Sequence, residues 1–365
     1  MRRERARELL EGFRDRRVVL IGDLMMDEWV FGTVKRISPE APIPVVTMPL
    51  SDHARSYKPG GAGNVAAVLL ELGARVSIFG VVGEDDLGRR LLADLEGRGA
   101  DVSGVLRDRA RPTTHKMRIL AGRQQLLRVD TEEGAPLSGE LGSQLRERLG
   151  SALRKADVAL VSDYAKGVIS EVSIPGELVA AAREAGVPLC ADPKPQNMEL
   201  FRGAHLVSPN EAEALQAVGA ANYGQTGSAP SSKRRERKIA RPPELPDAVF
   251  RAGLLLRERL EAGAVFVTRG DRGIAVFPRE GAVAMVPARS FSPTAGGVGA
   301  GATEVGDGTG CGDAASAASA LAIAAGADFR EAAELANAAG GVVSRFVGVY
   351  SPRPAEILAA LGPGA

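Results

Sequence analysis

Cysteine, tryptophan and a net charge of either sign are all scarce in this chain. Its 365 residues include 2 cysteines and 1 tryptophan, and aromatic residues make up 4%. Cys190 and Cys311 cannot build a disulfide framework, so we expect a protein of the reducing cytoplasm. The formal charge is only +1, because 46 lysines and arginines face 45 acidic residues. A protein that binds nucleic acid through its phosphates usually carries a larger basic excess, so we expect no nucleic-acid partner.

Long apolar runs are missing as well. No stretch approaches the roughly 20 apolar residues that cross a bilayer. The charged start, Met1-Arg-Arg-Glu-Arg, is not followed by the apolar core of a secretory signal. We therefore expect no membrane partner. The composition, 45% apolar and 25% charged, is typical of a globular protein with a sizeable core, and we expect an enzyme.

Short apolar runs alternate with amphipathic stretches along most of the chain. The alternation predicts an α/β fold in which helices cover both faces of a mostly parallel central sheet. Length alone would allow two or three domains, but the unbroken rhythm favours a single domain over residues 1–365. The expected strands are 17–22, 76–82, 158–162, 188–192, 205–208 and 265–268, and the expected helices are 64–72, 86–97 and 174–185.

Four segments depart from this rhythm. Residues 42–58 and 113–130 are rich in β-formers without intervening helices, which predicts antiparallel strands of a small lid over the carboxyl edge of the sheet. Two surface hairpins without a function are the alternative. The polar, proline-rich residues 220–246 and the small residues 290–302 are expected to be flexible insertions.

The strongest local signal is Asp307-Gly-Thr-Gly-Cys-Gly-Asp313, directly before an alanine-rich helix candidate at 314–325. Backbone N–H groups at a helix N-terminus bind anions, and Gly310 and Gly312 would let the chain close around one. Asp313 beside such an anion suits a base that takes a proton from an attacking hydroxyl, which favours phosphoryl transfer. An ordinary glycine turn, with Asp313 facing the helix dipole, explains the same residues.

Two further elements could contact a sugar. Pro59-Gly-Gly-Ala-Gly-Asn64 opens a helix, and the Asn64 amide can both donate to and accept from a hydroxyl. Asp27 follows the first strand, at the sheet edge where α/β proteins bind ligands. Common surface turns are the alternative for both.

Two elements could serve a nucleotide and its metal. In Ser208-Pro-Asn-Glu-Ala-Glu213, residues Asn210, Glu211 and Glu213 supply the oxygen ligands that Mg²⁺ prefers. Asn210 and Glu213 also have the spacing of a helix capping box, and both interpretations can hold together. Residues 268–273 form a turn between two strands that could contact a nucleotide or be a plain hairpin.

Taken together, these elements resemble the ribokinase-like (PfkB) family of carbohydrate kinases. Gly60–Asn64 is similar to the N-terminal motif of that family, Asn210–Glu213 to its N-x-x-E element, and Asp307–Asp313 to its C-terminal signature. The resemblance implies a three-layer α/β/α domain with a small β lid. It further implies ATP and Mg²⁺ as cofactors, with potassium dependence left open, and a homodimer formed through the lid strands.

Other segments are similar to those family members that phosphorylate a heptose 7-phosphate. They are Gly22–Asp27, Arg36–Val46, Gln124–Asp130, Ser162–Gly167 and Asp192–Lys194. This similarity implies transfer from ATP to the anomeric hydroxyl of D-glycero-D-manno-heptose 7-phosphate, a step toward ADP-heptose and lipopolysaccharide precursors. The alternatives are a kinase of another sugar and a non-catalytic sugar- or nucleotide-binding protein. A nicotinamide-dependent dehydrogenase is disfavoured, since no G-x-G-x-x-G follows the first strand.

The resemblance also implies a role for each site residue. The implied base is Asp313, with the amides of Gly310, Cys311 and Gly312 as an anion hole. The implied ATP and Mg²⁺ side consists of Lys194, Asn210, Glu211, Ala212, Glu213, Thr268, Gly270, Gly273 and Asn337, with Asn210 and Glu213 serving the metal. The implied sugar side consists of Asp27, Gly60, Gly61 and Asn64, with Arg118, Arg128 and Lys166 as unranked partners of the sugar phosphate. Because no nucleotidyltransferase domain follows residue 365, we expect a stand-alone kinase.

Overall fold

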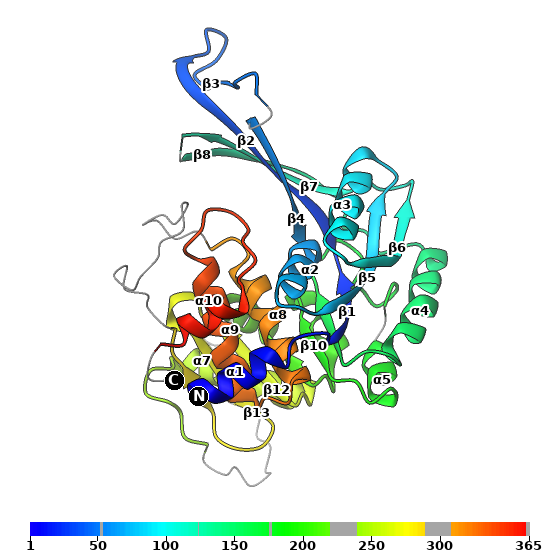
Figure 1. Ribbon diagram of the computed structural model, residues 1–365, viewed down its shortest axis with the longest axis vertical. Helices are drawn as coiled ribbons and strands as arrows, with labels where there is room; N and C mark the ends of the chain where they lie inside the picture. The colour runs from blue at the N-terminus through cyan, green and yellow to red at the C-terminus, as the bar shows by residue number, and fades with distance from the viewer. Residues whose placement is uncertain (52–53, 123, 175–176, 220–238, 289–307, 363–365) are drawn as a thin grey trace.

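The chain is built on two β-sheets of different size. The computed structural model describes residues 1–51, 54–122, 124–174, 177–219, 239–288 and 308–362. A nine-stranded sheet carries most of the helices, and a five-stranded sheet stands out from it at one side (Figure 1). Within these ranges, no helix is long and apolar enough to span a membrane.

The large sheet is mostly parallel, as the alternation predicted. Its strands follow the order β14-β13-β12-β11-β10-β9-β1-β5-β6. Seven neighbouring strands run parallel: β1 (Arg17–Gly22), β5 (Arg75–Gly83), β6 (Asp101–Asp108), β9 (Val158–Ser162), β10 (Leu189–Asp192), β11 (Leu206–Val207) and β12 (Ala264–Thr268). Two antiparallel strands, β13 (Ile274–Pro278) and β14 (Ala284–Val286), complete one edge.

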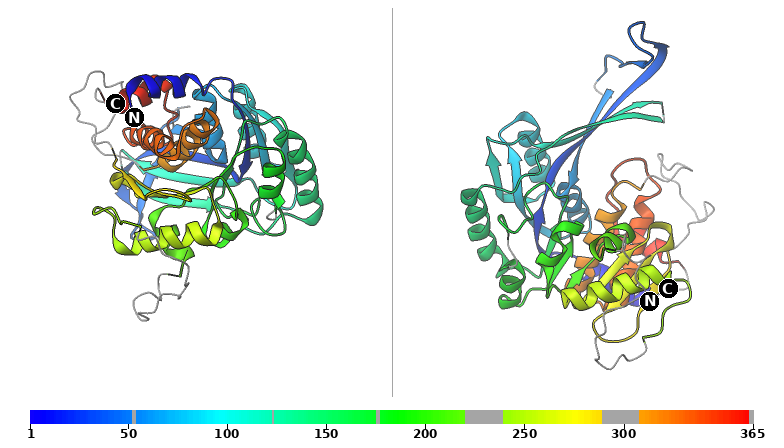
Figure 2. Two further views of the ribbon diagram at one scale, coloured as in Figure 1. Left: turned by 90° about the horizontal axis from the view of Figure 1, so that it is seen from below. Right: turned by 180° about the vertical axis from the view of Figure 1, so that it is seen from behind.

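Helices cover both faces of this sheet and enclose a hydrophobic core on each (Figure 2). Strand β1 contributes to both cores because side chains alternate along a strand: Val18 and Leu20 lie in one, Val19 and Ile21 in the other. One core is covered by α1 (Arg3–Glu11), α2 (Ala62–Glu71), α3 (Asp86–Gly97), α8 (Cys311–Ala324), α9 (Phe329–Val343) and α10 (Pro354–Ala360). The other is covered by α4 (Gly139–Leu153), α5 (Glu177–Glu184), α6 (Glu211–Ala217), α7 (Asp247–Leu260) and the 3₁₀ helix η2 (Pro195–Phe201). The three-layer α/β/α arrangement is thereby confirmed.

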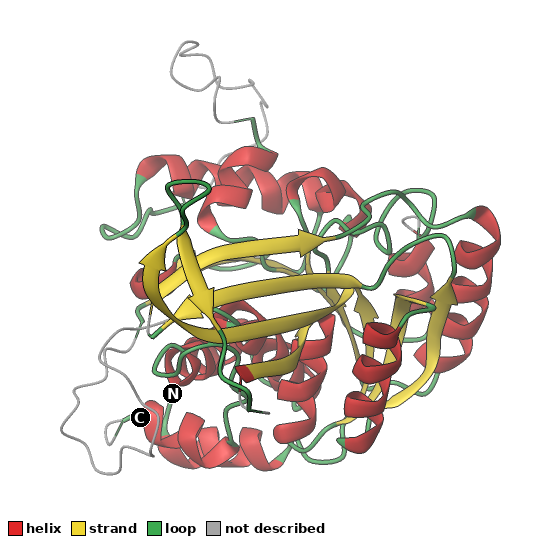
Figure 3. Cartoon of the chain, turned by 90° about the horizontal axis from the view of Figure 1, so that it is seen from above, coloured by secondary structure: helices red, strands yellow, loops and turns green. Residues whose placement is uncertain are grey.

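The small sheet contains strands from both segments expected to form a lid, 42–58 and 113–130, together with a strand, β2, that precedes them. It contains β2 (Leu24–Ile37), β3 (Pro44–Thr47), β4 (Arg55–Gly61), β7 (Thr114–Ala121) and β8 (Gln124–Thr131), which lie nearest the viewer in Figure 3, where the molecule is seen from above. The longest strand, β2, was missed: it begins one residue after β1, where we expected the chain to leave the first strand in a turn.

The pairing within the lid differs in one respect from the antiparallel arrangement that we expected. Strand β2 pairs antiparallel with β3 and β4 but parallel with β7, and β7 pairs antiparallel with β8. The chain between β2 and β7 passes through the main sheet and returns in its original direction, which makes that pair parallel. Of the two predicted insertions, 290–302 and most of 220–246 lie outside the described residues.

Candidate active site

The predicted base lies where two glycine-rich helix starts meet. Asp313 sits in the first turn of α8 and is buried. The side-chain amide of Asn64, in the first turn of α2, donates to Asp313 Oδ2 at 2.6 Å. Gly310 has a φ of +79°, and a Cβ there would lie 2.9 Å from Asn64 Nδ2. Glycine is therefore needed at 310 both for its backbone conformation and for the close approach of the two helices.

A second donor to the base is Tyr164, for which no role was predicted. Its hydroxyl donates to Asp313 Oδ1 at 2.5 Å from the loop that follows β9. Burial raises the pKa of Asp313, and the hydrogen bonds from Asn64 and Tyr164 act in the opposite direction. The result is a carboxylate that is held at both oxygens and shielded from bulk water.

The residues of the anion hole implied by the resemblance lie at the start of α8, and one of their amides already has a partner. Gly310 caps helix α8, and Cys311 and Gly312 are the first two residues of that helix. The helix dipole favours an anion at this end. The Cys311 amide donates to the Gly308 carbonyl at 3.2 Å. That bond has to open before this amide can bind a phosphoryl oxygen.

The loop after β9 is fixed by a second buried carboxylate, which the sequence also left without a role. Asp23, only 1% exposed, follows β1. Its Oδ2 accepts from the backbone N–H groups of Tyr164 at 2.7 Å and Lys166 at 3.1 Å, and its Oδ1 from that of Val168 at 3.2 Å. One side chain at the end of β1 thus sets the path of the loop that delivers Tyr164. The signal in the sequence was an acidic residue directly at the end of a buried strand.

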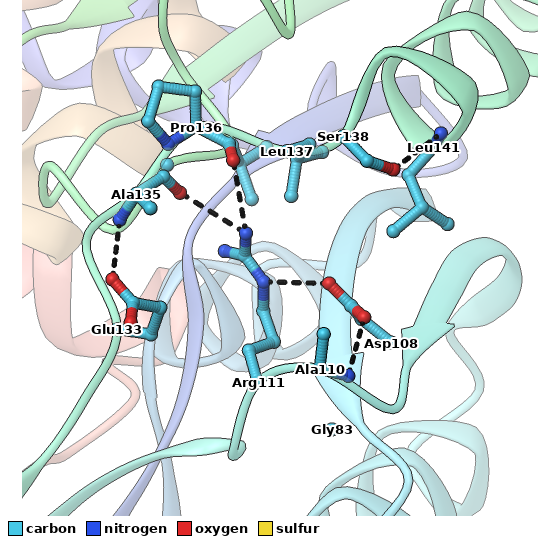
Figure 4. A network of polar contacts seen from close by, with 12 residues as sticks. Gly83, Asp108, Ala110, Arg111, Glu133, Ala135, Pro136, Leu137, Ser138 and Leu141 are labelled. Carbon is cyan, nitrogen blue, oxygen red and sulfur yellow. Dashed lines mark hydrogen bonds and ion pairs between the residues drawn. The ribbon is translucent and has the colours of Figure 1, made fainter.

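Arg111 also binds the loop after β9. Its guanidinium donates to the carbonyl of Lys166 at 3.2 Å. Figure 4 shows it also bound to the carbonyls of Ala135, at 3.1 Å, and Pro136, at 3.4 Å, and to the carboxylate of Asp108, at 3.0 Å. Because Arg111 precedes β7, it ties the start of a lid strand to the loop after β9.

The N-x-x-E element is a helix cap and the partner of a lysine at once. Asn210 Oδ1 accepts from the Glu213 N–H, and Glu213 Oε2 accepts from the Asn210 N–H, both at 2.9 Å. Glu213 Oε1 also binds Lys194 Nζ at 2.5 Å. Burial lowers the pKa of Lys194, but the carboxylates around it, first Glu213 and then Asp192 and Asp163, together raise it above the ordinary value. This cluster brings together the predicted Asn210, Glu213 and Lys194.

The other residues predicted for the nucleotide side have partners of their own. Glu211 binds Arg269 at 2.8 Å and Arg272 at 3.1 Å. The arginines flank or lie in the 3₁₀ helix η4 (Gly270–Arg272), within the predicted turn Thr268–Gly273. Thr268 pairs through its backbone with Asn210, which places this turn beside the N-x-x-E element.

Ala212 and Asn337 do not join this cluster through their side chains. Ala212 is exposed on α6 and has only a methyl group. Asn337, on α9, donates to the carbonyl of Val286 at 2.8 Å and so ties α9 to the end of β14. A role near the adenine remains a prediction.

The described residues around this cluster do not form a complete set of metal ligands. In the part of the chain that the structure describes, no group of three or more His, Cys, Asp or Glu side chains is arranged to hold an ion. Mg²⁺ in phosphoryl-transfer sites is usually held by one or two protein oxygens together with substrate phosphates and water. The oxygens of Asn210 and Glu213 fit that manner of binding.

The lid presents a polar face that includes the predicted sugar side. Asp27, Trp29 and Arg118 share this face because strand side chains alternate. Arg118 binds Asp27 Oδ1 at 2.5 Å, and its guanidinium lies 5.0 Å from the centre of the Trp29 ring. A Cβ at Gly60 would lie 2.4 Å from Asp27 Oδ2, so glycine is required there. Gly61, with a φ of +55°, follows at the start of α2.

The other predicted cations belong to a charge cluster near this face, and the structure adds one that the sequence missed. Lys116 binds Asp130 at 2.8 Å and Glu132 at 3.2 Å. Lys166 shares Glu132, at 2.8 Å. Arg128 binds Asp130 at 2.9 Å, but half of its side chain is exposed. The structure therefore distinguishes Arg118, whose side chain is 12% exposed, from the solvated Arg128.

A buried carboxylate at a glycine-rich helix N-terminus, together with a lid that has a polar face, is typical of phosphotransferases that act on a hydroxyl. The family model for pfkB family carbohydrate kinases matches residues 15–356. The chain belongs to this family and is a sugar kinase.

Comparisons with individual proteins agree with this assignment. The chain is 36% identical to the bifunctional protein HldE of Geobacter metallireducens over 366 residues, which cover 99% of this chain and 66% of that protein. It is 38% identical to HldE of Halorhodospira halophila over 355 residues, covering 97% and 65%. The chain thus spans just under two thirds of the length of these relatives.

Solved structures confirm the ribokinase-like fold. A ribokinase of Arabidopsis thaliana in complex with ribose and ATP matches with a TM-score of 0.66 and 20% identity, over 95% of this chain and 99% of that one. Phosphofructokinase-2 of Escherichia coli in complex with potassium matches with a TM-score of 0.67 and 17% identity, over 95% and 98%.

Proposed function

We propose that this kinase transfers the γ-phosphoryl group of ATP to the anomeric hydroxyl of D-glycero-D-manno-heptose 7-phosphate. The observation that carries the proposal is the placement of Arg118, a largely shielded arginine, on the same lid face as Asp27. The negative charge of Asp27, its partner, is near enough to raise the pKa of Asp313 further. A sugar whose reacting hydroxyl lies at Asp313 can therefore direct its own phosphate group toward the lid. The similarity to HldE proteins supports a heptose as that sugar.

In the proposed reaction, Asp313 accepts the proton of the anomeric hydroxyl. The hydroxyl oxygen forms a bond to the γ-phosphorus, the bond from that phosphorus to the bridging oxygen breaks, and ADP leaves with the electron pair. Charge on the transferred group is stabilised by the amides of Gly310 and Gly312, by the helix dipole and, once its bond to Gly308 opens, by the amide of Cys311.

On the nucleotide side, we propose that Lys194 binds the ATP phosphates. Asn210 and Glu213 would hold Mg²⁺, directly or through water, and the ion supplies charge neutralisation on the phosphates. Potassium dependence is tested by replacing potassium with sodium in the assay.

The first experiment is a phosphorus NMR time course with ATP, Mg²⁺ and the heptose 7-phosphate, run beside ribose and fructose 6-phosphate. We expect a new anomeric phosphate on the heptose only, and none with Asp313→Asn. Turnover of ribose or fructose 6-phosphate alone would keep the kinase but exclude the heptose. ATP binding without turnover of any of the three sugars would favour a non-catalytic binding protein.

Two matched arginine variants test how the sugar phosphate is bound. The side chain of Arg118 is largely shielded from solvent on the polar face, whereas that of Arg128 is half exposed on β8. We expect Arg118→Met to raise the KM for the sugar phosphate more than tenfold and Arg128→Met to change it less than threefold, because a desolvated cation binds a phosphate more strongly than a hydrated one. Equal effects of the two variants would contradict this ranking.

We also propose that the opposite, apolar face of the lid forms a homodimer. Cross-strand pairing places Met117, Ile119, Leu127 and Val129 on that face, and Leu127 is 55% and Val129 40% exposed. Adjacent exposed apolar side chains on a sheet favour a self-complementary interface. Sedimentation should show a dimer that Leu127→Lys dissociates. Val172→Lys, at a residue 57% exposed outside the lid, should leave it intact. A wild-type monomer at micromolar concentration would refute the interface.

A further inference from the structure

Tyr164 shares the Asp313 carboxylate with Asn64, although the proposed reaction needs only the base. The Tyr164 hydroxyl binds Oδ1 at 2.5 Å, and the Asn64 amide binds Oδ2 at 2.6 Å. An ionised carboxylate can accept about four hydrogen bonds. Two fixed donors therefore leave acceptor positions for a sugar hydroxyl, and the phenol can stay in place while the sugar binds.

The backbone around Tyr164 is fixed before any substrate arrives. The N–H of Tyr164 donates to the buried Asp23 at 2.7 Å. The next residue, Ala165, has a φ of +56°, a conformation that residues other than glycine seldom adopt. Its N–H donates to Asp163 at 2.8 Å. Such an unfavourable conformation persists only where surrounding contacts impose it, and it often marks a functional loop.

Charged groups from several elements surround the pair. Asp27 on β2 raises the pKa of Asp313, and Lys194, after β10, lowers it. Burial, followed by the charges of Asp313, Asp192 and Asp27, raises the pKa of Tyr164 well above its ordinary value. The phenol therefore keeps its hydrogen and remains a donor throughout the working range of pH.

We propose that Tyr164 is a positioning residue of the kinase reaction, whose phenolic hydrogen holds the Asp313 carboxylate in one orientation and in its ionised form while the sugar binds. The inference rests on the proposed role of Asp313 as base. Tyr164 transfers no proton itself and acts through the carboxylate. In the variant Tyr164→Phe, the ring remains, 5.3 Å from Lys194 Nζ, and only the hydroxyl is lost.

A spectroscopic test needs no sugar substrate. The chain has 4 tyrosines, so labelling their ζ carbons with ¹³C gives a simple NMR spectrum, in which Tyr164→Phe assigns one resonance. We expect the Tyr164 resonance to titrate at acidic pH as Asp313 takes up a proton, and this titration to vanish in Asp313→Asn. A Tyr164 resonance that is indifferent to pH, or unaffected by Asp313→Asn, would overturn the proposal.

A kinetic test uses whichever sugar the enzyme phosphorylates. We expect Tyr164→Phe to shift the acidic limb of the pH profile of kcat to higher pH by about one unit. The reason is that the ionised form of Asp313 loses one hydrogen bond in this variant. The loss of kcat should be largest at acidic pH and should disappear as the pH rises and Asp313 is ionised in both proteins. Tyr350→Phe, which removes a phenol bound to Glu356 outside the site, should leave the profile unchanged. A loss that is equal at every pH would refute the positioning role.

The two proposals fail in different ways. If the heptose is not the substrate, the NMR titration of Tyr164 is unaffected. If Asp313→Asn retains full activity, the base assignment fails even though the contact between the two side chains persists in the NMR spectrum.

Discussion

The buried Asp23 makes the stability of this kinase depend on pH in a direction opposite to that of most carboxylates. Burial, opposed by the N–H groups of Lys166, Tyr164 and Val168, raises the pKa of Asp23 from 3.8 to about 6. The unfolded chain therefore loses this proton at lower pH than the folded chain does. The contribution of Asp23 to stability is full below pH 4 and is lost as the pH rises through 6.

The magnitude follows from the size of the shift. About two pH units correspond to about 3 kcal/mol of unfolding free energy, of which about 2 kcal/mol is lost between pH 4.5 and 7.5. Asp23→Asn removes this pH dependence. It also places an NH₂ group where Oδ1 accepted the N–H of Val168, which costs about 1–3 kcal/mol at every pH.

Urea denaturation of both proteins from pH 4.5 to 7.5 measures the two effects separately. The variant should be the less stable at pH 4.5, and the deficit should shrink by about 2 kcal/mol toward pH 7.5. Asp157→Asn is the control: its hydrogen bond to Arg17 lowers the pKa of Asp157, so this carboxylate is ionised in both states over most of the range. A deficit that stays constant with pH would refute the reasoning for Asp23.

Two further pairs of variants separate function from folding. Gly310→Ala should reduce kcat at least tenfold because the new Cβ would meet Asn64, whereas Gly326→Ala, with a φ of +84° but open space around it, should lose only about 1 kcal/mol of stability; equal kcat values would contradict this. Glu213→Gln keeps the capping geometry but removes the charge that faces the nucleotide side, so the KM for MgATP should rise about tenfold, as for other losses of a charged hydrogen bond. Glu331→Gln, in the equivalent box of α9, should leave that KM unchanged.

The main sheet could be predicted because its strands are buried on both faces and are separated by amphipathic helices. Such runs are apolar throughout, as in β9 and the buried part of β1. The same rule failed for β2, whose first seven residues are buried and whose last seven are mostly exposed. The first half of that strand is buried and the second half is mostly exposed, so no single period describes it.

The candidate site could be predicted as a set of positions but not as a set of contacts. Asn64, Lys194 and Asp313 each follow a strand or open a helix, as residues at the carboxyl edge of an α/β sheet do. Asp27, which was expected in a turn after the first strand, lies within the lid strand β2. This rule brings a residue to the site without stating its partner. Arg118 illustrates the difference, because its burial against Asp27 depends on the parallel pairing of β2 with β7.

Tyr164 shows most clearly which contacts could not be predicted from the sequence. It lies 149 positions from Asp313, and a tyrosine after a buried strand is as compatible with packing as with a polar contact. What distinguishes it is the carboxylate of Asp23, which accepts the N–H groups of both Tyr164 and Lys166 and so forces the loop to turn toward α8. An acidic residue at the end of one strand thus determines where a side chain after the neighbouring strand points. Deriving that from sequence requires knowing first that β1 and β9 are neighbours, which the sheet order decides and local patterns do not.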